Sequence, residues 1–148
     1  MNIVPASSVH FEKAIALLQQ NQLPVDDIHT GTQLFIAEEN NDVIGTIAVE
    51  YDYDTALLRS LSVAPGKREK GIGIELVKFI EDYVKQQGVR EIYLLTTTAA
   101  DFFTKRNYVS VERSGVPDFI RQTSEFSGIC PSTATVMKKT MEAPGLSN

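Results

Sequence analysis

The sequence has little that would cross-link it, anchor it in a membrane or hold a metal. Its one cysteine, Cys130, cannot pair within the chain, and its two histidines are too few and too isolated to suggest a zinc site. No apolar run approaches the roughly 18 residues that a membrane span requires. The N-terminus also lacks the basic and apolar regions of a signal peptide. These absences predict a soluble, cytoplasmic protein without a metal.

An excess of positive charge is also missing. Fourteen Lys and Arg residues stand against nineteen Asp and Glu residues, which gives a net charge of −5. This balance disfavours general binding to nucleic acid or to an anionic membrane, so any site for an anion must be local. The 148 residues suit one domain with a sufficient core. We expect that domain to cover residues 1–140, followed by a flexible tail over 141–148.

The periodicity of apolar residues predicts one α+β domain rather than a doubly wound parallel sheet. A short strand at "NIVPA" precedes a helix with Phe11, Ala14 and Leu18 among its apolar positions. Three β-rich runs separated by "ENND" and "DYD" predict an antiparallel meander over about 33–38, 42–51 and 55–63. A helix over about 71–87, a strand in "VREIYLLTTT", a short helix in "AADFFTKRN" and two later strands, with a helical turn after Pro117, complete the order.

The run from Pro65 to Gly73 crowds three basic residues and three glycines between the third meander strand and the long helix. A helix N-terminus leaves its first amides unpaired and carries about half a positive charge. Glycine lets backbone donors converge on a ligand. The segment from Arg68 to Gly73 is therefore predicted to cradle a phosphate. The alternative is an ordinary solvated turn.

The usual phosphate motifs do not fit this segment. Leu76 stands where the dinucleotide fingerprint needs its third glycine, and no Gly-Lys-Ser/Thr is present. What remains is Arg68-x-x-Gly71-x-Gly73 between a strand and a helix. This pattern resembles the acyl-CoA pyrophosphate loop, Arg/Gln-x-x-Gly-x-Gly/Ala, of the GNAT family of N-acetyltransferases. The element order is also the family's, so the resemblance covers nearly the whole chain. It implies a mixed, mostly antiparallel sheet flanked by helices on both faces, with acetyl-CoA as the cofactor.

A second motif, "DFFTKRNYVSV", is similar to the family's Phe-Tyr-x-x-x-Gly-Phe segment beside the thiol arm of the cofactor. Phe102 and Phe103 fill the Phe-Tyr positions, Asn107 the glycine and Tyr108 the following aromatic. In the family that tyrosine often protonates the departing thiolate, which Phe103 cannot do. The alternative interpretation makes Phe102 and Phe103 core residues.

The resemblance implies roles for the strand and the loop. Backbone groups of Leu61 and Val63 would pair with the pantetheine arm, and the Leu61 N–H would be the oxyanion donor. The loop would bind the pyrophosphate, with Lys67 or Lys70 neutralising the remaining charge. The implied cofactor-binding residues are Leu61, Ser62, Val63, Arg68, Glu69, Lys70, Gly71, Ile72, Gly73, Thr96, Phe102 and Phe103.

Two charged residues complete the predicted catalytic set with Leu61. Glu50, near the end of its strand, is the candidate base, directly or through a water; the alternative is a strand-end surface charge. Arg59 is the candidate grip for a substrate carboxylate, which its guanidinium matches bidentately. Strand alternation would put Arg59 and Leu61 on one face and turn Ser60 to the other.

The predicted function is transfer of an acetyl group from acetyl-CoA to the amine of a small acceptor, amino-acid-like or a toxin, by direct attack in a ternary complex. The stretches "LRSLSVAP", "YLLTTTAADFF" and "SGICPSTATVM" are similar to the arsenic-resistance acetyltransferases of the same superfamily. The missing tyrosine at Phe103 keeps a second hypothesis open, a module that binds acyl-CoA without turnover. The sequence leaves the identity of the acceptor open. If the protein is an oligomer, we expect a homodimer through the C-terminal strands.

Overall fold

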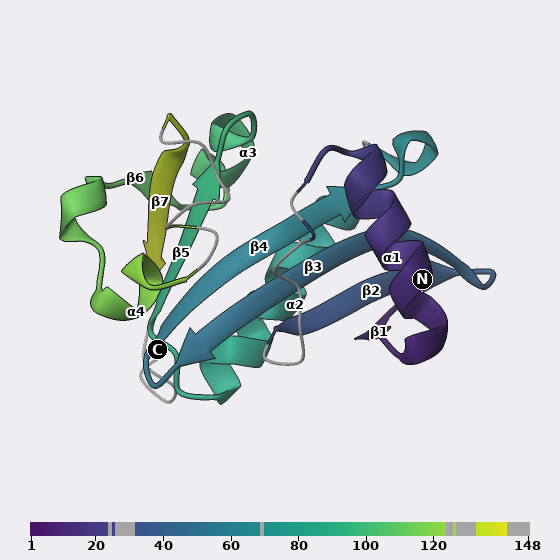
Figure 1. The fold of residues 1–148 in the computed structure, drawn as a ribbon, viewed down its shortest axis with the longest axis horizontal. Coiled ribbons are helices and arrows are strands. Elements are labelled where there is room, and N and C mark those ends of the chain that lie inside the picture. Colours follow the sequence, from purple (N-terminus) through teal and green to yellow (C-terminus); the bar gives the residue numbers. More distant parts are fainter. Residues whose placement is uncertain (24, 26–31, 69, 124–125, 127–132, 142–148) are drawn as a thin grey trace. The chain divides into compact units, whose positions relative to one another are not determined.

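The chain forms one mixed sheet, and helices occur in several of the connections between its strands (Figure 1). The computed structural model describes residues 1–23, 25, 32–68, 70–123, 126 and 133–141. Its elements are β1 (Asn2–Pro5), α1 (Ser8–Gln20), β2 (Gln33–Glu39), β3 (Asp42–Asp52), β4 (Thr55–Val63), α2 (Ile72–Gln86), β5 (Glu91–Thr96), α3 (Ala100–Thr104), β6 (Val109–Ser110), α4 (Asp118–Arg121) and β7 (Thr135–Thr140). The predicted order of helices and strands is confirmed.

The sheet has the strand order β1-β2-β3-β4-β5-β7-β6. Its β4–β5 pair is parallel, while β1–β2, β2–β3, β5–β7 and β6–β7 are antiparallel. This confirms the expected mixed, mostly antiparallel sheet of an α+β fold. The parallel pairing covers Thr55–Leu57 of β4, opposite Glu91, Ile92 and Tyr93.

Two compact units divide the chain, Met1–Glu50 with Leu58–Tyr83, and Tyr51–Leu57 with Val84–Asn148. In the first unit, the alternation of β2 distributes its side chains over two helices. Leu34 and Ile36 join the core that contains Ala14 of α1. Phe35, on the opposite face, packs edge-on against Phe79 of α2 at a centroid distance of 5.0 Å. Helices therefore cover both faces of this part of the sheet, as the sequence predicted.

A glycine in β3 lets α2 approach the sheet closely. A Cβ at Gly45 would lie 3.0 Å from Leu76 Cδ1 of α2 and 3.1 Å from the Ser62 carbonyl oxygen of β4. Such contacts leave no room for a side chain. The close approach brings the N-terminal part of α2 next to the C-terminal end of β4, where the predicted phosphate loop connects them.

One predicted core residue of α1 is not buried. Ala14, Leu17 and Leu18 are buried, but 42% of Phe11 is exposed. Phe11 lies nearly two turns before Leu18 on the same helix face. Periodicity predicts the face of a residue but not whether another element covers that turn, and the turn with Phe11 stays exposed. Ser7 is the N-cap of α1, and its side chain hydrogen-bonds His10 Nδ1 at 3.0 Å rather than a backbone amide.

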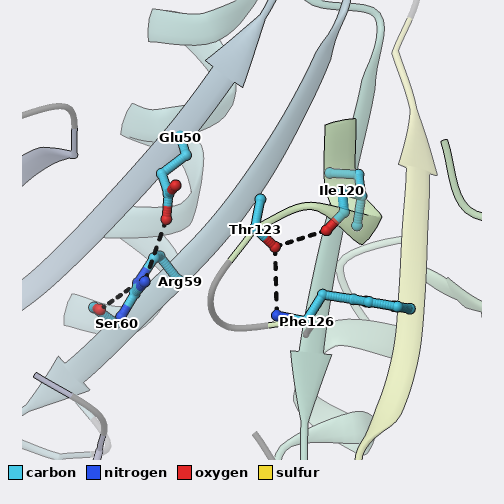
Figure 2. Close-up of polar contacts among 6 residues, drawn as sticks. All are labelled: Glu50, Arg59, Ser60, Ile120, Thr123 and Phe126. Carbon is cyan, nitrogen blue, oxygen red and sulfur yellow. Dashed lines mark hydrogen bonds and ion pairs between the residues drawn. The ribbon is translucent and has the colours of Figure 1, made fainter. Parts of the chain in front are cut away.

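The second unit has its own core, built from Leu57, Tyr93, Val116, Ile120 and Val136. After α4, the buried Thr123 hydroxyl donates to the Ile120 carbonyl oxygen at 2.7 Å and accepts from the Phe126 amide at 3.3 Å (Figure 2). Left-handed residues follow two helices, Gly88 with φ 95° after α2 and Asn107 with φ 75° after α3.

The described chain ends at Met141, one residue past the predicted domain boundary. Met141, predicted to begin the tail, is buried, and its amide donates to the Arg90 carbonyl oxygen at 2.7 Å. The rest of the predicted tail, 142–148, lies outside the described residues.

Candidate functional site

The predicted phosphate loop connects β4 to the N-terminus of α2. Gly71 has a left-handed φ of 79°, and its carbonyl oxygen accepts the first helical hydrogen bond, from the Glu75 amide at 3.0 Å. Apart from its chain neighbours and the backbone of α2, no atom of the described residues lies within 4 Å of where a Cβ at Gly71 would be. The amides of Ile72 and Gly73 fall in the first turn, where an α-helix offers no internal acceptor. The loop thus has the open, donor-rich form expected for an anion; Glu69 lies outside the described residues.

The side chain of Arg68 lies back against the end of β4. Its Nε donates to the Val63 carbonyl oxygen at 3.2 Å, and its Nη2 donates to Asn21 Oδ1 at 2.7 Å. Asn21, the residue that follows α1, also donates from Nδ2 to the Val63 carbonyl oxygen at 3.2 Å and contacts Ser62 Oγ. No sequence motif identified Asn21, because it lies 47 residues before Arg68 and meets it only in the fold.

Lys67 is engaged by an acidic residue of β2. Its Nζ lies 3.0 Å from Glu39 Oε1, and both side chains are about two-fifths exposed. The hydrogen bond from Lys67, and then its charge, hold the pKa of the Glu39 carboxyl below its ordinary value of 4.5. Lys67 also lines a cavity of about 470 Å³ with Lys13 of α1. Lys13 donates to the Asn41 carbonyl oxygen at 3.2 Å, so both lysines of this cavity are already bonded to protein oxygens.

The two predicted catalytic side chains, Glu50 and Arg59, meet in an ion pair (Figure 2). Arg59 Nη1 lies 3.2 Å from Glu50 Oε2; the Arg59 side chain is fully buried and that of Glu50 is 18% exposed. Glu50 is thus a partly buried, paired carboxylate near the end of β3, and its role as the base stays a prediction. A buried guanidinium needs a partner of opposite charge, and Glu50 supplies it.

The alternation predicted for β4 fails at Ser60. Ser60 is buried with a left-handed φ of 59°, and its Oγ accepts a hydrogen bond from Arg59 Nε at 3.2 Å. The expectation that Ser60 points away from Arg59 is therefore wrong. Alternation assumes extended backbone at every residue, and a left-handed residue turns the chain. The Ser60 carbonyl oxygen accepts from the buried Thr46 Oγ1 at 2.8 Å.

The predicted residues of the second unit form the turn into α3 and its aromatic cluster. Thr96 Oγ1 accepts from the Ala99 amide at 2.9 Å, and Ala99 is the N-cap of α3. Phe103 is 5% exposed and packs edge-on against Phe102 and Tyr108 at 5.1 and 5.4 Å. The interpretation of Phe103 as a core residue is confirmed.

Three further observations concern metal binding, membrane insertion and Cys130. It holds no group of three His, Cys, Asp or Glu side chains placed to ligate a metal. None of the helices it contains has the length and apolar character needed to cross a membrane. Cys130 lies outside the described residues.

Known proteins share both sequence and fold with this chain. A sequence profile described as the acetyltransferase (GNAT) family matches residues 7–108. An uncharacterized N-acetyltransferase of Chlorobaculum tepidum is 36% identical over 87 residues, 58% of this chain and 56% of that protein. An amino-acid acetyltransferase of Pseudomonas fluorescens is 34% identical over 85 residues, 55% of this chain and 20% of that protein. The matches thus cover about half or less of these relatives.

Solved structures extend the likeness over almost the whole chain. N-acetylglutamate synthase from Neisseria gonorrhoeae, complexed with coenzyme A and N-acetyl-glutamate, has a TM-score of 0.81 at 18% identity over 95% of this chain and 35% of that chain. An aminoglycoside 6'-N-acetyltransferase complexed with coenzyme A has a TM-score of 0.71 at 17% identity over 95% and 97% of the two chains. These likenesses establish the fold, and with the profile match over more than half of the sequence, the chain belongs to the GNAT family of acetyltransferases.

Proposed function

We propose that this protein transfers an acetyl group from acetyl-CoA to the amine of a small, amino-acid-like or toxin acceptor, by direct attack in a ternary complex. The observation that carries the proposal is the loop before α2, where Arg68, Gly71 and Gly73 of the family motif lie at a helix start with a left-handed glycine. Coenzyme A in the complexes of the synthase and the aminoglycoside acetyltransferase supports the choice of cofactor.

The loop residues fit a diphosphate group. At Gly71 the left-handed backbone and the absence of a side chain let the following amides of α2 face a ligand. Arg68 supplies a fixed positive charge, and Lys70 lies exposed in the same loop. A cation and a helix N-terminus both favour an anion, so the two contributions act together.

The end of β4 binds the pantetheine arm in this proposal. A carbonyl oxygen has two lone pairs, and that of Val63 already accepts from Asn21 and Arg68. Pairing with the pantetheine arm therefore requires one donor to leave. We expect Arg68 rather than Asn21 to leave, because its guanidinium would then exchange the neutral Val63 carbonyl oxygen for a charged pyrophosphate oxygen.

The chemistry needs a proton acceptor and a donor to the oxyanion. Bound acetyl-CoA supplies the reactive thioester. The Leu61 amide would donate to the oxyanion that such a transfer develops, and Glu50, directly or through a water, would take the proton of the acceptor ammonium. Arg59 is proposed to attract an acceptor carboxylate, which would compete with Glu50 for this guanidinium. Phe103 has no proton to give, so water protonates the thiolate.

The acceptor is the least constrained part of the proposal. Both the relative from Pseudomonas fluorescens and the synthase from Neisseria gonorrhoeae act in amino-acid acetylation by their names, which favours an amino-acid-like acceptor. The resemblance to arsenic-resistance acetyltransferases adds an amino-acid-like arsenical to the acceptors worth testing. Its Cys-Pro-Ser motif begins at Cys130, outside the described residues.

A thiol-release assay with the full chain tests the proposal. Acetyl-CoA is offered with a panel of amino acids, amine-bearing toxins and an amino-acid-like arsenical, and coenzyme A binding is measured by calorimetry. We expect binding of the coenzyme and thiol release with at least one amine. Binding without release for any acceptor would favour the module that binds acyl-CoA without turnover. Absence of coenzyme binding would overturn both functions.

A further inference from the structure

Ser60 holds an unfavourable backbone conformation inside a strand. A non-glycine residue in the left-handed region is sterically strained, and Ser60 adopts φ 59° while only 8% exposed. Such a conformation persists where its surroundings over-determine it. Ser60 immediately precedes Leu61, whose amide is the proposed oxyanion donor, so the direction of that amide depends on the Ser60 backbone.

Buried side chains from β3 and β4 hold Ser60 from two sides. Thr46, fully buried on β3, donates from Oγ1 to the Ser60 carbonyl oxygen at 2.8 Å. Arg59 donates from Nε to Ser60 Oγ at 3.2 Å, and its Nη1 is paired with Glu50 of β3 (Figure 2). Thr46 thus fixes the backbone of Ser60, while Glu50 fixes its side chain through Arg59. We name these four residues the Ser60 clamp.

We infer that Thr46 is a positioning residue: the Ser60 clamp sets the direction of the Leu61 amide and of the β4 backbone that receives the pantetheine arm. In a regular strand, successive N–H groups point alternately to the two neighbouring strands. A left-handed residue rotates the peptide that follows it, so the amide after Ser60 leaves the pattern of the ladder. This inference rests on the proposed function, because it assigns a purpose to the amide that the proposed reaction uses.

Two substitutions at Thr46 separate positioning from packing. Thr46→Val keeps the shape and removes the donor to Ser60, whereas Thr46→Ser keeps the donor and removes a methyl group. Thr55→Val is the matched control, because Thr55 is also buried and its hydroxyl donates outside the clamp, to Asp54 Oδ1 at 3.2 Å. Each variant is titrated by calorimetry with coenzyme A and with adenosine 3′-phosphate 5′-diphosphate, which lacks the pantetheine arm, and kcat and KM are measured with the acceptor found for the wild type.

The expected result is selective for the arm and for the chemical step. Loss of one buried hydrogen bond that aims a backbone donor should weaken coenzyme A binding and lower kcat by about threefold to tenfold. The affinity of Thr46→Val for the diphosphate fragment should stay at the wild-type value. Thr46→Ser should keep coenzyme A affinity and kcat at wild-type values, and Thr55→Val should change neither quantity. Wild-type coenzyme affinity and kcat in Thr46→Val, equal loss for both ligands, or equal impairment of Thr46→Ser would overturn the inference.

A second variant covers a folding failure of Thr46→Val. Ser60→Ala removes the bond from Arg59 but keeps an L-residue at the strained position, so one of the two contacts that hold the left-handed backbone is lost and kcat should fall. Retained kcat in Ser60→Ala would count against the clamp. Failure of the proposed function looks different, because a wild type that binds coenzyme A but releases no thiol still allows the comparison of the two ligands. A wild type that does not bind coenzyme A removes both proposals.

Discussion

Replacing Gly71 by alanine tests the loop through its backbone alone. A Cβ at Gly71 meets no atom within 4 Å, so the change introduces no clash and removes no side-chain contact. What it introduces is an L-residue at φ 79°, which costs roughly 1–2 kcal/mol. Gly71 is exposed, and no side chain of the described chain would pack against a Cβ there. We therefore expect the loop of the unbound variant to leave the left-handed conformation. Binding must then restore that conformation, and its free-energy cost is subtracted from the binding free energy.

That strain sets the expected loss of affinity. Because 1.4 kcal/mol corresponds to a factor of ten, Gly71→Ala should raise the Kd for coenzyme A by about fivefold to thirtyfold. The melting temperature should change little, since the loop and not the packed body of α2 relaxes. Calorimetric titration of the full chain gives the Kd, and the diphosphate fragment without the pantetheine arm should lose the same factor.

Gly66 provides the matched control. It lies in the same connection, is exposed, and has no atom within 4 Å of a Cβ position, but its φ is outside the left-handed region. Gly66→Ala should bind coenzyme A with the wild-type Kd. An unchanged Kd in Gly71→Ala, or an equal loss in Gly66→Ala, would refute the assignment of the loop to the pyrophosphate.

Three other changes test neighbouring parts of the site. Arg68→Ala should raise the Kd for coenzyme A by tenfold or more, because a charge-assisted bond contributes roughly 1.5–3 kcal/mol; a wild-type titration curve would mean that Arg68 stays on Asn21 and Val63. Glu50→Gln, which keeps an acceptor for Arg59, should depress kcat mainly at neutral pH, and a full-speed variant with intact melting behaviour would move the proton to water. Lys67→Met should raise the pKa of Glu39 toward its ordinary value of 4.5, followed by NMR titration, because the lysine is what lowers it. Since the folded pKa is the lower one, this pair stabilises the wild type above about pH 4.5 and ceases to do so as the pH falls through the folded value, so an unshifted Glu39 in the variant would contradict the ion pair.

The sequence was informative wherever a local rule decides the outcome. The turn residues between β2, β3 and β4 gave the meander, and the amphipathic pattern of α2 gave its length and buried face. Gly71, Gly88 and Asn107 stand where the chain turns left-handed, a conformation that side chains other than glycine and asparagine seldom adopt. The pyrophosphate motif belongs to this class, because its amides are supplied by consecutive residues.

Residues that act through distant partners were beyond local rules. Asn21 bonds to Ser62, Val63 and Arg68, and nothing in its own neighbourhood indicates this. Glu50 and Arg59 were both singled out, yet their pairing with each other depends on how β3 lies beside β4. Phe11 obeys the helical period and is still exposed, because burial also depends on what lies opposite that turn.

Ser60 marks the boundary between the two kinds of information. By itself, the order of residues determined the family, the sequence of elements and the loop before α2, since each follows from spacing along the chain. Only the tertiary structure decided that a serine would hold a left-handed backbone inside β4, because its energetic cost is met by Thr46 and Arg59, buried side chains whose geometry exists only once β3 and β4 are side by side.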